Sequence, residues 1–364
     1  MVFISRHELE ELCSGIFQKL GIPEEEAGDS ALILVAADAR GIRSHGVGRI
    51  KRYVDGIKGG YMKGGVKPSI LRETPISLVL DAEGGMGLSL SKNSMKKVIA
   101  MAKEHGVGVC SIRNSNHFGI AGFYSEMAAG EDMIGIAMTN TAALGVPTFA
   151  REAMFGTNPI AFAAPASGGR IFSLDMATTT VTRGKVEVYQ RENKKLPPGW
   201  AVGTNGLGTD DPAKLLDDML YKRGGGLLPL GGEGEELSGY KGYGLAVMVD
   251  ILTALCSGGT FGGAVMDSGV TSARVCHFFM ALRIDLFRDP EAFKNDMGRM
   301  LDDLTALKPA EGAPRVYYAG LKEREAEERA EREGVPLTGG VWETLKKTAE
   351  ELGLPVPAPR RGRE

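Results

Sequence analysis

Residues 42–53 read Ile-Arg-Ser-His-Gly-Val-Gly-Arg-Ile-Lys-Arg-Tyr and space three chemically versatile side chains four positions apart. On a helix, His45, Arg49 and Tyr53 would lie on one face, roughly 6 Å apart along the axis. An acid/base, a carboxylate-binding cation and a hydroxyl donor on one face suit a small oxo or hydroxy acid. The alternative is an ordinary amphipathic helix whose polar side faces water.

A second histidine motif, Asn-Ser-Asn-His-Phe-Gly-Ile-Ala-Gly, occupies residues 114–122. It follows a strand-like run at 107–112 and precedes a helical pattern at 121–130, which predicts that His117 lies on a strand-to-helix loop. Such loops often carry reactive side chains. A loop histidine bonded to backbone groups is the alternative, but the recurrence of a histidine motif favours a functional interpretation of both.

Helical signals open the chain on both sides of the first motif. Residues 5–20 begin with a capping box at Ser5-Arg-His-Glu8, and an Ala- and Leu-rich pattern covers 24–38. Ser44 can cap a third helix from His45 to about Ile57. The sequence therefore predicts three successive helices.

The signals change between about 76 and 304, where short β-rich runs alternate with helical patterns. The predicted strands are 76–80, 107–112, 134–138, 160–163 and 280–284, and the predicted helices are 90–104, 121–130, 212–221 and 242–256. Helical patterns return at 289–306, 321–333 and 341–352. This alternation predicts a mixed sheet with covering helices.

The two helical ends are expected to pack together as one domain. The predicted organisation is a helical domain of 1–75 with 305–354, a central domain of 76–304, and a Pro- and Arg-rich disordered tail of 355–364. The charged run 321–333 is interpreted as a solvated helix face with pairs such as Glu325–Arg329 and Glu328–Arg332.

Composition excludes several classes of protein. The net charge of −3 favours neither nucleic acid nor an anionic membrane surface as a partner. Four scattered cysteines in apolar segments are typical of buried thiols in a reducing compartment, and there is no signal peptide or long apolar run. We expect a cytoplasmic protein. Its five histidines are too dispersed to predict a metal site.

Glycine is abundant, at 51 of 364 residues, but the usual nucleotide fingerprints are missing. Neither Gly-x-Gly-x-x-Gly after a strand nor the P-loop motif occurs, so a nucleotide would have to bind in another way. Two loops could offer anion contacts. Asp175-Met-Ala-Thr-Thr-Thr180 follows a short strand, and Gly239-Tyr-Lys-Gly-Tyr-Gly244 opens a helix beside Lys241. Ordinary turns with a solvated lysine are the alternative.

Six blocks together resemble the type 2 malate/L-lactate dehydrogenase family. They are Asp38-Ala-Arg-Gly-Ile-Arg-Ser-His-Gly, Asn116-His-Phe-Gly, Gly156-Thr-Asn-Pro, Asp175-Met-Ala-Thr-Thr, Pro198-Gly-Trp-Ala and Gly239-Tyr-Lys-Gly-Tyr-Gly. The blocks occur in the family's order over almost the whole chain. The family also includes L-sulfolactate and ureidoglycolate dehydrogenases, diketogulonate reductase and piperideine-carboxylate reductases.

The resemblance implies an α+β fold with a non-Rossmann nicotinamide-binding domain, a largely antiparallel central sheet and a helical domain from both chain ends, assembled as a homodimer. It implies hydride transfer between NAD, or NADP, and C2 of a small 2-oxo acid, which gives an L-2-hydroxy acid. No metal is implied.

The resemblance also assigns roles to residues. His117 would be the acid/base with His45 beside it, and the sequence does not decide which of the two transfers the proton. Arg49 would bind the substrate carboxylate and Tyr53 would assist. The family's cofactor-contact positions correspond to Thr141, Asp175, Met176, Ala177, Lys241 and Gly242.

Two blocks depart from the family pattern. Gly203 stands where an aspartate is common, and Arg274-Val-Cys-His277 replaces an Asn-x-Gly-His turn, which puts cofactor contacts there in doubt. Asn116 and Phe118 resemble the malate/lactate version of their block. An imino-acid reductase, a ureidoglycolate dehydrogenase and a non-catalytic dinucleotide-binding member remain the alternatives.

Overall fold

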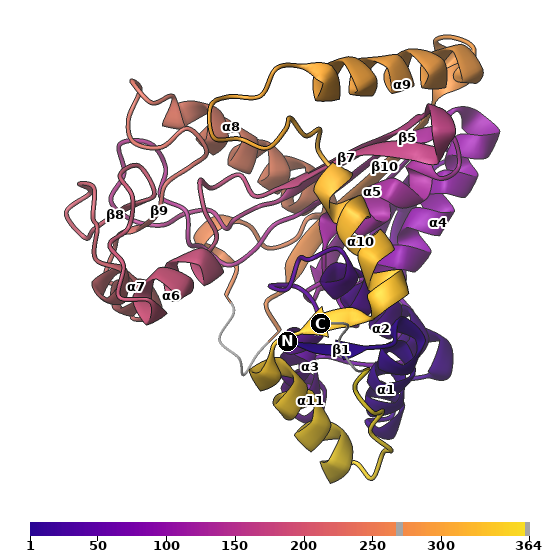
Figure 1. Ribbon diagram of the computed structural model, residues 1–364, viewed down its shortest axis with the longest axis horizontal. Helices are drawn as coiled ribbons and strands as arrows, with labels where there is room; N and C mark the ends of the chain where they lie inside the picture. Colours follow the sequence, from indigo (N-terminus) through magenta and orange to yellow (C-terminus); the bar gives the residue numbers. More distant parts are fainter. Residues whose placement is uncertain (267–271, 361–364) are drawn as a thin grey trace.

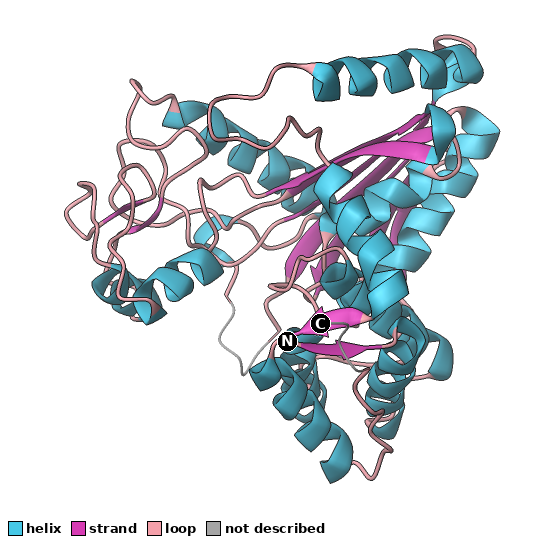
Figure 2. Ribbon diagram, in the orientation of Figure 1, coloured by secondary structure: helices cyan, strands magenta, loops and turns pink. Residues whose placement is uncertain are grey.

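A seven-stranded sheet forms the centre of the computed structural model, which describes residues 1–266 and 272–360 (Figures 1 and 2). The strand order is β2-β3-β4-β10-β5-β6-β7, and five of the six pairings are antiparallel, with β3 and β4 parallel. The strands are β2 (Ser69–Glu73), β3 (Ser77–Asp81), β4 (Val107–Ser115), β5 (Met133–Thr139), β6 (Ile160–Ala166), β7 (Arg170–Met176) and β10 (Val275–Arg283). The expected mixed α/β character is confirmed.

Helices cover both faces of this sheet. Cys110 and Ile112 of β4 point into the core with α4 (Gly87–His105), while the intervening Ser111 donates to the carbonyl of Leu252 on the other face. Leu252 belongs to a π-helical turn, Ile251–Leu255, that continues α8 (Gly239–Asp250). The helix α5 (Ala121–Ala129) packs against β5, β6 and β7, and α9 (Pro290–Ala306) packs against β6.

The two ends of the chain meet. The strand β1 (Val2–Ile4) pairs with β11 (Val335–Leu337), so the N-terminal strand and the segment near the C-terminal end of the described chain lie in the same part of the molecule (Figure 1). Around them lie α1 (Arg6–Lys19), α2 (Glu24–Ala39), α3 (Ile50–Lys58), α10 (Leu321–Glu333) and α11 (Gly339–Glu351). This arrangement supports the two-ended helical domain, which we retain as a proposal.

A smaller group of elements packs around its own apolar cluster. It contains α6 (Arg183–Arg191), β8 (Ala201–Val202), α7 (Pro212–Leu220) and β9 (Gly226–Leu227). Val186, Leu215 and Leu227 are among its buried residues. Short 3₁₀ turns at Val47–Arg49, Ser167–Gly169, Gly262–Ala264 and Ile284–Leu286 complete the elements. None of the helices in the described ranges is long and apolar enough to span a bilayer.

Three sequence predictions need correction. The third helix does not begin at His45, because residues 47–49 form a 3₁₀ turn and α3 begins at Ile50, so no single helical face carries the three side chains. Neither Ser5 nor Ser44 acts as a side-chain cap: Ser5 precedes α1 without a capping bond, and the Ser44 hydroxyl bonds the ring of His45.

The charged helix α10 is largely solvated as predicted, with Ala330 its only buried residue, but Glu325 and Glu328 pair with Arg315 and Arg324 and not with the predicted Arg329 and Arg332. Its Glu327 bonds Arg6 and Arg40 of the N-terminal helices. Part of the predicted disordered tail has contacts too. Val356 packs against the core and the Arg360 N–H donates to the Phe3 carbonyl at 2.8 Å, whereas residues 361–364 lie outside the described ranges.

Candidate active site

The His117 loop connects β4 to α5, as predicted. The side-chain amide of Asn116 donates to the carbonyl oxygens of Gly84 and Gly85, both at 2.9 Å, and the Asn116 side chain is almost fully buried. This bonding fixes the loop against the segment that leads into α4. His117 itself stays half-buried, so its ring is held from one side and keeps contact with solvent.

Tyr53 holds one nitrogen of that ring. Its hydroxyl lies 2.6 Å from His117 Nδ1 and 3.4 Å from the His117 carbonyl oxygen, and the Gly119 N–H donates to Nδ1 at 3.3 Å. The hydroxyl can donate to a bare Nδ1, or accept from a protonated Nδ1 while its own proton turns to the carbonyl. Within the described ranges Nε2 has no hydrogen-bond partner, which leaves it for a substrate.

His45 faces the same ring from a different part of the chain. The two imidazoles stack with centroids 5.5 Å apart and planes inclined by 18°, and Nδ1 of His45 lies 2.8 Å from the Ser44 hydroxyl. His45 lies in the bend that precedes the 3₁₀ turn. His45 and Tyr53 therefore both contact His117, but they do not lie on one helix as predicted.

A buried carboxylate anchors the bend that carries His45. Asp38, at the end of α2, accepts the N–H of Val47 at 2.6 Å. Position 46 must be glycine, because a Cβ there would lie 2.1 Å from Asp38 Oδ2. Burial raises the pKa of Asp38 to about 7 against the opposing effects of this bond and of Arg43. Asp38 is thus a positioning residue for His45.

Arginines make the histidine pair electropositive. Arg49 donates from Nε to the Ser44 carbonyl at 2.7 Å, which places it beside the His45 bend. Burial lowers the pKa of His45 to about 4, with further lowering by Arg49 and Arg52. Burial likewise holds the pKa of His117 well below its usual range, and His45 and Arg52 add to the effect. An anion bound here would oppose these charges and raise both pKa values.

Asp175 connects the His117 loop to the predicted cofactor residues. It lies near the end of β7, and its carboxylate accepts the Gly122 N–H at 2.7 Å in the first turn of α5. Asp175 is solvent-accessible, but desolvation by the surrounding protein raises its pKa to about 6. Met176 ends β7, and Ala177 follows it; both are half-buried.

Thr141 lies in the loop after β5. Its hydroxyl accepts the Thr157 N–H at 3.0 Å, and its own N–H donates to Asn158 Oδ1 at 3.1 Å. Asn158 is fully buried and also donates to the carbonyl of Ala246 in α8, at 3.0 Å. One amide side chain therefore fixes the Thr141 loop to the helix of the Lys241 block.

Lys241 and Gly242 lie in the first turn of α8, as predicted. The Lys241 side chain is exposed, whereas Gly242 packs so closely on Leu230 that a Cβ would lie 2.3 Å from the Leu230 nitrogen. Leu230 donates in turn to the carbonyl of Thr178, just beyond Ala177. The loops that carry the predicted cofactor residues are thus bonded to one another.

His277 belongs to neither group. It is fully buried in β10, where Nδ1 lies 2.8 Å from the Thr139 hydroxyl and Nε2 lies 2.8 Å from the Ser115 hydroxyl. Its ring stacks on Phe118 with centroids 4.6 Å apart and planes inclined by 2°. Burial lowers its pKa to about 3, so it is neutral at pH 7. No cluster of three or more His, Cys, Asp or Glu side chains suited to a metal occurs in 1–266 and 272–360.

Sequence reasoning missed the supporting residues Asp38 and Asn158 as members of the site. Both occur in the blocks that carried the family resemblance, so their presence there was the available signal. What the sequence did not give is their task, because each bonds a backbone group in a distant segment: Asp38 bonds Val47, and Asn158 bonds Thr141 and Ala246.

Comparison with known proteins gives one consistent result. Residues 4–346 match the sequence model of the malate/L-lactate dehydrogenase family. A malate dehydrogenase from Pyrococcus abyssi is 42% identical over 97% of this chain and 96% of its own length. An L-sulfolactate dehydrogenase from Methanocaldococcus jannaschii is 37% identical over 95% of this chain and 96% of its own. The crystal structure of malate dehydrogenase from Entamoeba histolytica superposes with a TM-score of 0.93 at 35% identity, covering 98% of this chain and 99% of that one.

Proposed function

Because the chain belongs to the malate/L-lactate dehydrogenase family, we propose that it transfers a hydride between a nicotinamide cofactor and C2 of a small 2-oxo acid, producing an L-2-hydroxy acid. The observation that carries this proposal is the stacked pair of His45 and His117, tied to Tyr53 and bordered by arginines. Such a cluster can bind an acid anion and exchange one proton with it.

The nicotinamide, when bound, supplies or accepts the hydride. Its binding residues would be Thr141, Asp175, Met176, Ala177, Lys241 and Gly242. Their chemistry fits a dinucleotide, because an exposed lysine in the first turn of a helix suits a phosphate, and hydroxyl and carboxylate oxygens suit ribose hydroxyls. We propose NAD, with NADP as the alternative, and a homodimeric assembly.

Arg49 would bind the substrate carboxylate and so orient its C2 carbonyl toward His117. A charge-assisted hydrogen bond of this kind contributes about 1.5–3 kcal/mol. The same carboxylate would raise the pKa of His117 from its lowered value, because its negative charge favours the imidazolium. Binding of the acid would therefore promote protonation of the group that must supply a proton.

In reduction, protonated His117 would give the proton on Nε2 to the C2 oxygen as the hydride reaches C2. The proton on Nδ1 would stay, donated to the Tyr53 hydroxyl, and the bond that a bare Nδ1 accepts from the Gly119 N–H would be lost. The neutral product tautomer then has a bare Nε2. In oxidation, that bare Nε2 would accept the proton of the hydroxy acid. His45 is the second candidate for this step, since its ring stacks on His117.

The test is initial-rate oxidation of NADH and NADPH with oxaloacetate, pyruvate, sulfopyruvate and 2-oxoglutarate, with Arg49→Met in parallel. We expect the highest rate with oxaloacetate, and a KM for it raised about 10–150-fold in Arg49→Met, the equivalent of about 1.5–3 kcal/mol. Lys51→Met is the matched control, because Lys51 is exposed on α3 and pairs with Asp55.

Other outcomes would point elsewhere. If no 2-oxo acid is reduced but a cyclic imino acid or ureidoglycolate reacts, the protein belongs to those branches of the family. If folded protein binds dinucleotide and turns over none of these compounds, the dehydrogenase proposal is wrong. An Arg49→Met enzyme with wild-type KM would remove only the assignment of the carboxylate-binding residue.

A further inference from the structure

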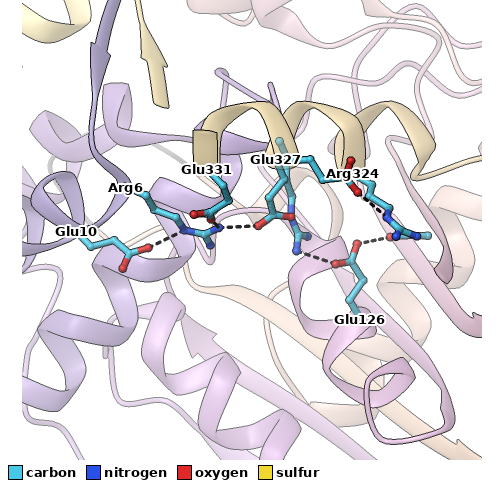
Figure 3. A network of polar contacts seen from close by, with 9 residues as sticks. Arg6, Glu10, Glu126, Arg324, Glu327 and Glu331 are labelled. Carbon is cyan, nitrogen blue, oxygen red and sulfur yellow. Dashed lines mark hydrogen bonds and ion pairs between the residues drawn. The ribbon is translucent and has the colours of Figure 1, made fainter. Parts of the chain in front are cut away.

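A network of ion pairs joins helices from distant parts of the chain (Figure 3). Glu327 on α10 and Glu126 on α5 lie near each other in this view, and both are bonded by Arg40, the C-cap residue that follows α2. Arg40 approaches Glu126 from Nη2 at 2.7 Å and Glu327 from Nε at 3.0 Å. Only 14% of its side-chain surface is exposed. One guanidinium thus bonds two carboxylates on two other helices.

The Arg40 side of this contact is close in sequence to the His45 bend, and the Glu126 side lies on the helix that follows the His117 loop. Arg40 follows Asp38 by two residues, and Asp38 anchors the bend that carries His45. Glu126 lies on α5, the helix that begins directly after the His117 loop. The Arg40–Glu126 pair therefore joins the end of the helix that leads to the His45 bend to the helix that follows the His117 loop.

Glu126 also reaches the predicted cofactor side. It accepts from the Ser173 hydroxyl of β7 at 2.6 Å, two residues before Asp175. Asp175 itself accepts the Gly122 N–H of the same helix. Desolvation is the main cause of the raised pKa of Asp175. Two nearby charges also affect this pKa: Glu126 raises it and Arg40 lowers it. The Arg40–Glu126 pair therefore lies between the histidine elements and β7.

We propose that Arg40 is a positioning residue that fixes the His45 bend relative to the His117 loop and β7 by bonding Glu126, with α10 holding it in place through Glu327. This role rests on the proposed dehydrogenase function. Arginine suits it better than lysine, because its planar group offers donors on separate edges to two carboxylates. A lysine at this position could keep one of the two contacts.

The test compares Arg40→Met with Arg6→Met. Arg6 is a matched control because it is similarly buried, with 22% of its side chain exposed, and contacts Glu10, Glu327 and Glu331, none of which lies on α5. We expect Arg40→Met to lower kcat with oxaloacetate by about tenfold or more with little change in KM, because small displacements of reacting groups cost large factors in rate. Arg6→Met should lower Tm and leave kcat unchanged.

Two further variants keep the test informative if Arg40→Met folds poorly. Arg40→Lys should recover part of the lost kcat, and Glu126→Gln should lower kcat in the same direction because it removes the charge at the other end. In the double variant Arg40→Met/Glu126→Gln the losses should not add, since both remove the same contact. Equal kcat in all variants, with changes in Tm alone, would overturn the proposal.

A second readout is independent of turnover. In NMR spectra of histidine-labelled protein, Arg40→Met should shift the ring resonances of His45 and His117 and leave those of buried His277 unchanged. Unshifted His45 and His117 resonances would overturn the positioning role even if the wild-type protein reduced none of the acids. Shifted resonances in an inactive wild-type background would retain the positioning role and remove only the dehydrogenase proposal.

Discussion

His117 precedes Phe118 in the chain and His277 stacks on the Phe118 ring, but the two histidines have contrasting environments. Both have a lowered pKa, caused first by burial. The ring of His277 is fully buried, with a hydroxyl at each nitrogen and Phe118 against its face. The ring of His117 is half-buried, and among the described residues only its Nδ1 has partners.

The difference separates the candidate proton-transfer histidine from a histidine bonded only within the protein. A lowered pKa does not, since both rings have it. The decisive features are the unengaged nitrogen and the ionic neighbours, because a ring with both nitrogens bonded has no lone pair or proton left for a substrate. His277 therefore contributes to stability, and His117 is the candidate for proton transfer.

The strongest test of this comparison is to replace each of the two histidines by glutamine. His117→Gln should lower kcat by about 10²–10⁴-fold, the usual contribution of a general acid/base, and leave the unfolding free energy close to wild type. His277→Gln should lower the free energy of unfolding and leave kcat, measured per folded molecule, close to wild type. Steady-state kinetics and urea unfolding of the two variants give the answer, and equal kcat losses would contradict the assignment.

Acid should reveal the structural histidine. The folded pKa of His277 is about 3 and its ordinary value is 6.5, so the unfolded chain takes up this proton first as the pH falls. The free energy of unfolding should consequently decrease between pH 6.5 and 3, by roughly 2–3 kcal/mol at pH 4.5. Urea unfolding at pH 7 and 4.5 measures it. Because the pKa values of His45 and His117 are lowered too, His277→Gln should remove only the part of the decrease that its own ring contributes, and exposed His7→Gln should retain the whole decrease.

Removal of the carboxylate beneath the His45 bend should cost stability. Asp38→Ala leaves the buried Val47 N–H without its acceptor, a loss of about 1–3 kcal/mol in the free energy of unfolding. Asp38→Asn keeps a carbonyl oxygen at that position and is the control. Thermal and urea unfolding measure both variants. If Asp38→Asn is destabilised as much as Asp38→Ala, the carboxylate charge matters more than the hydrogen bond.

The smallest effect concerns the bond that orients His117. Tyr53→Phe removes the hydroxyl at Nδ1 and should lower kcat by about tenfold, the equivalent of about 1.4 kcal/mol, while the Gly119 N–H still contacts the ring. Tyr318→Phe, in the separate cluster around Leu301, is the matched control and should leave kcat unchanged. Wild-type kcat in Tyr53→Phe would mean that packing alone orients the ring.

The sequence predicts best those helices that are rich in strong helix formers such as Ala, Leu and Glu. The helix expected at 24–38 is Glu24–Ala39, and the one expected at 321–333 has those same bounds. The strand β2 (Ser69–Glu73) was not predicted, because all five of its residues are exposed, and α6 (Arg183–Arg191) was not predicted either. Periodicity is visible only where burial alternates with exposure.

The sequence predicted individual residues of the candidate site but not how these residues are arranged in space. The helical spacing of His45, Arg49 and Tyr53 suggested one stripe, but Gly46 closes on Asp38 and the chain enters a 3₁₀ turn before the helix. His277 raised a doubt about cofactor contacts that its burial in β10 explains, since the ring points between strands to Ser115 and Thr139.

By itself the sequence determined the family, the local elements and the inventory of reactive side chains, because composition, periodicity and motif order are local properties of the chain. Only the tertiary structure decided that Tyr53 bonds a ring 64 residues away and that Arg40 bonds a carboxylate 287 residues away. Such contacts depend on how helices and sheet pack, and no pattern along the chain records which partners that packing brings within hydrogen-bond distance.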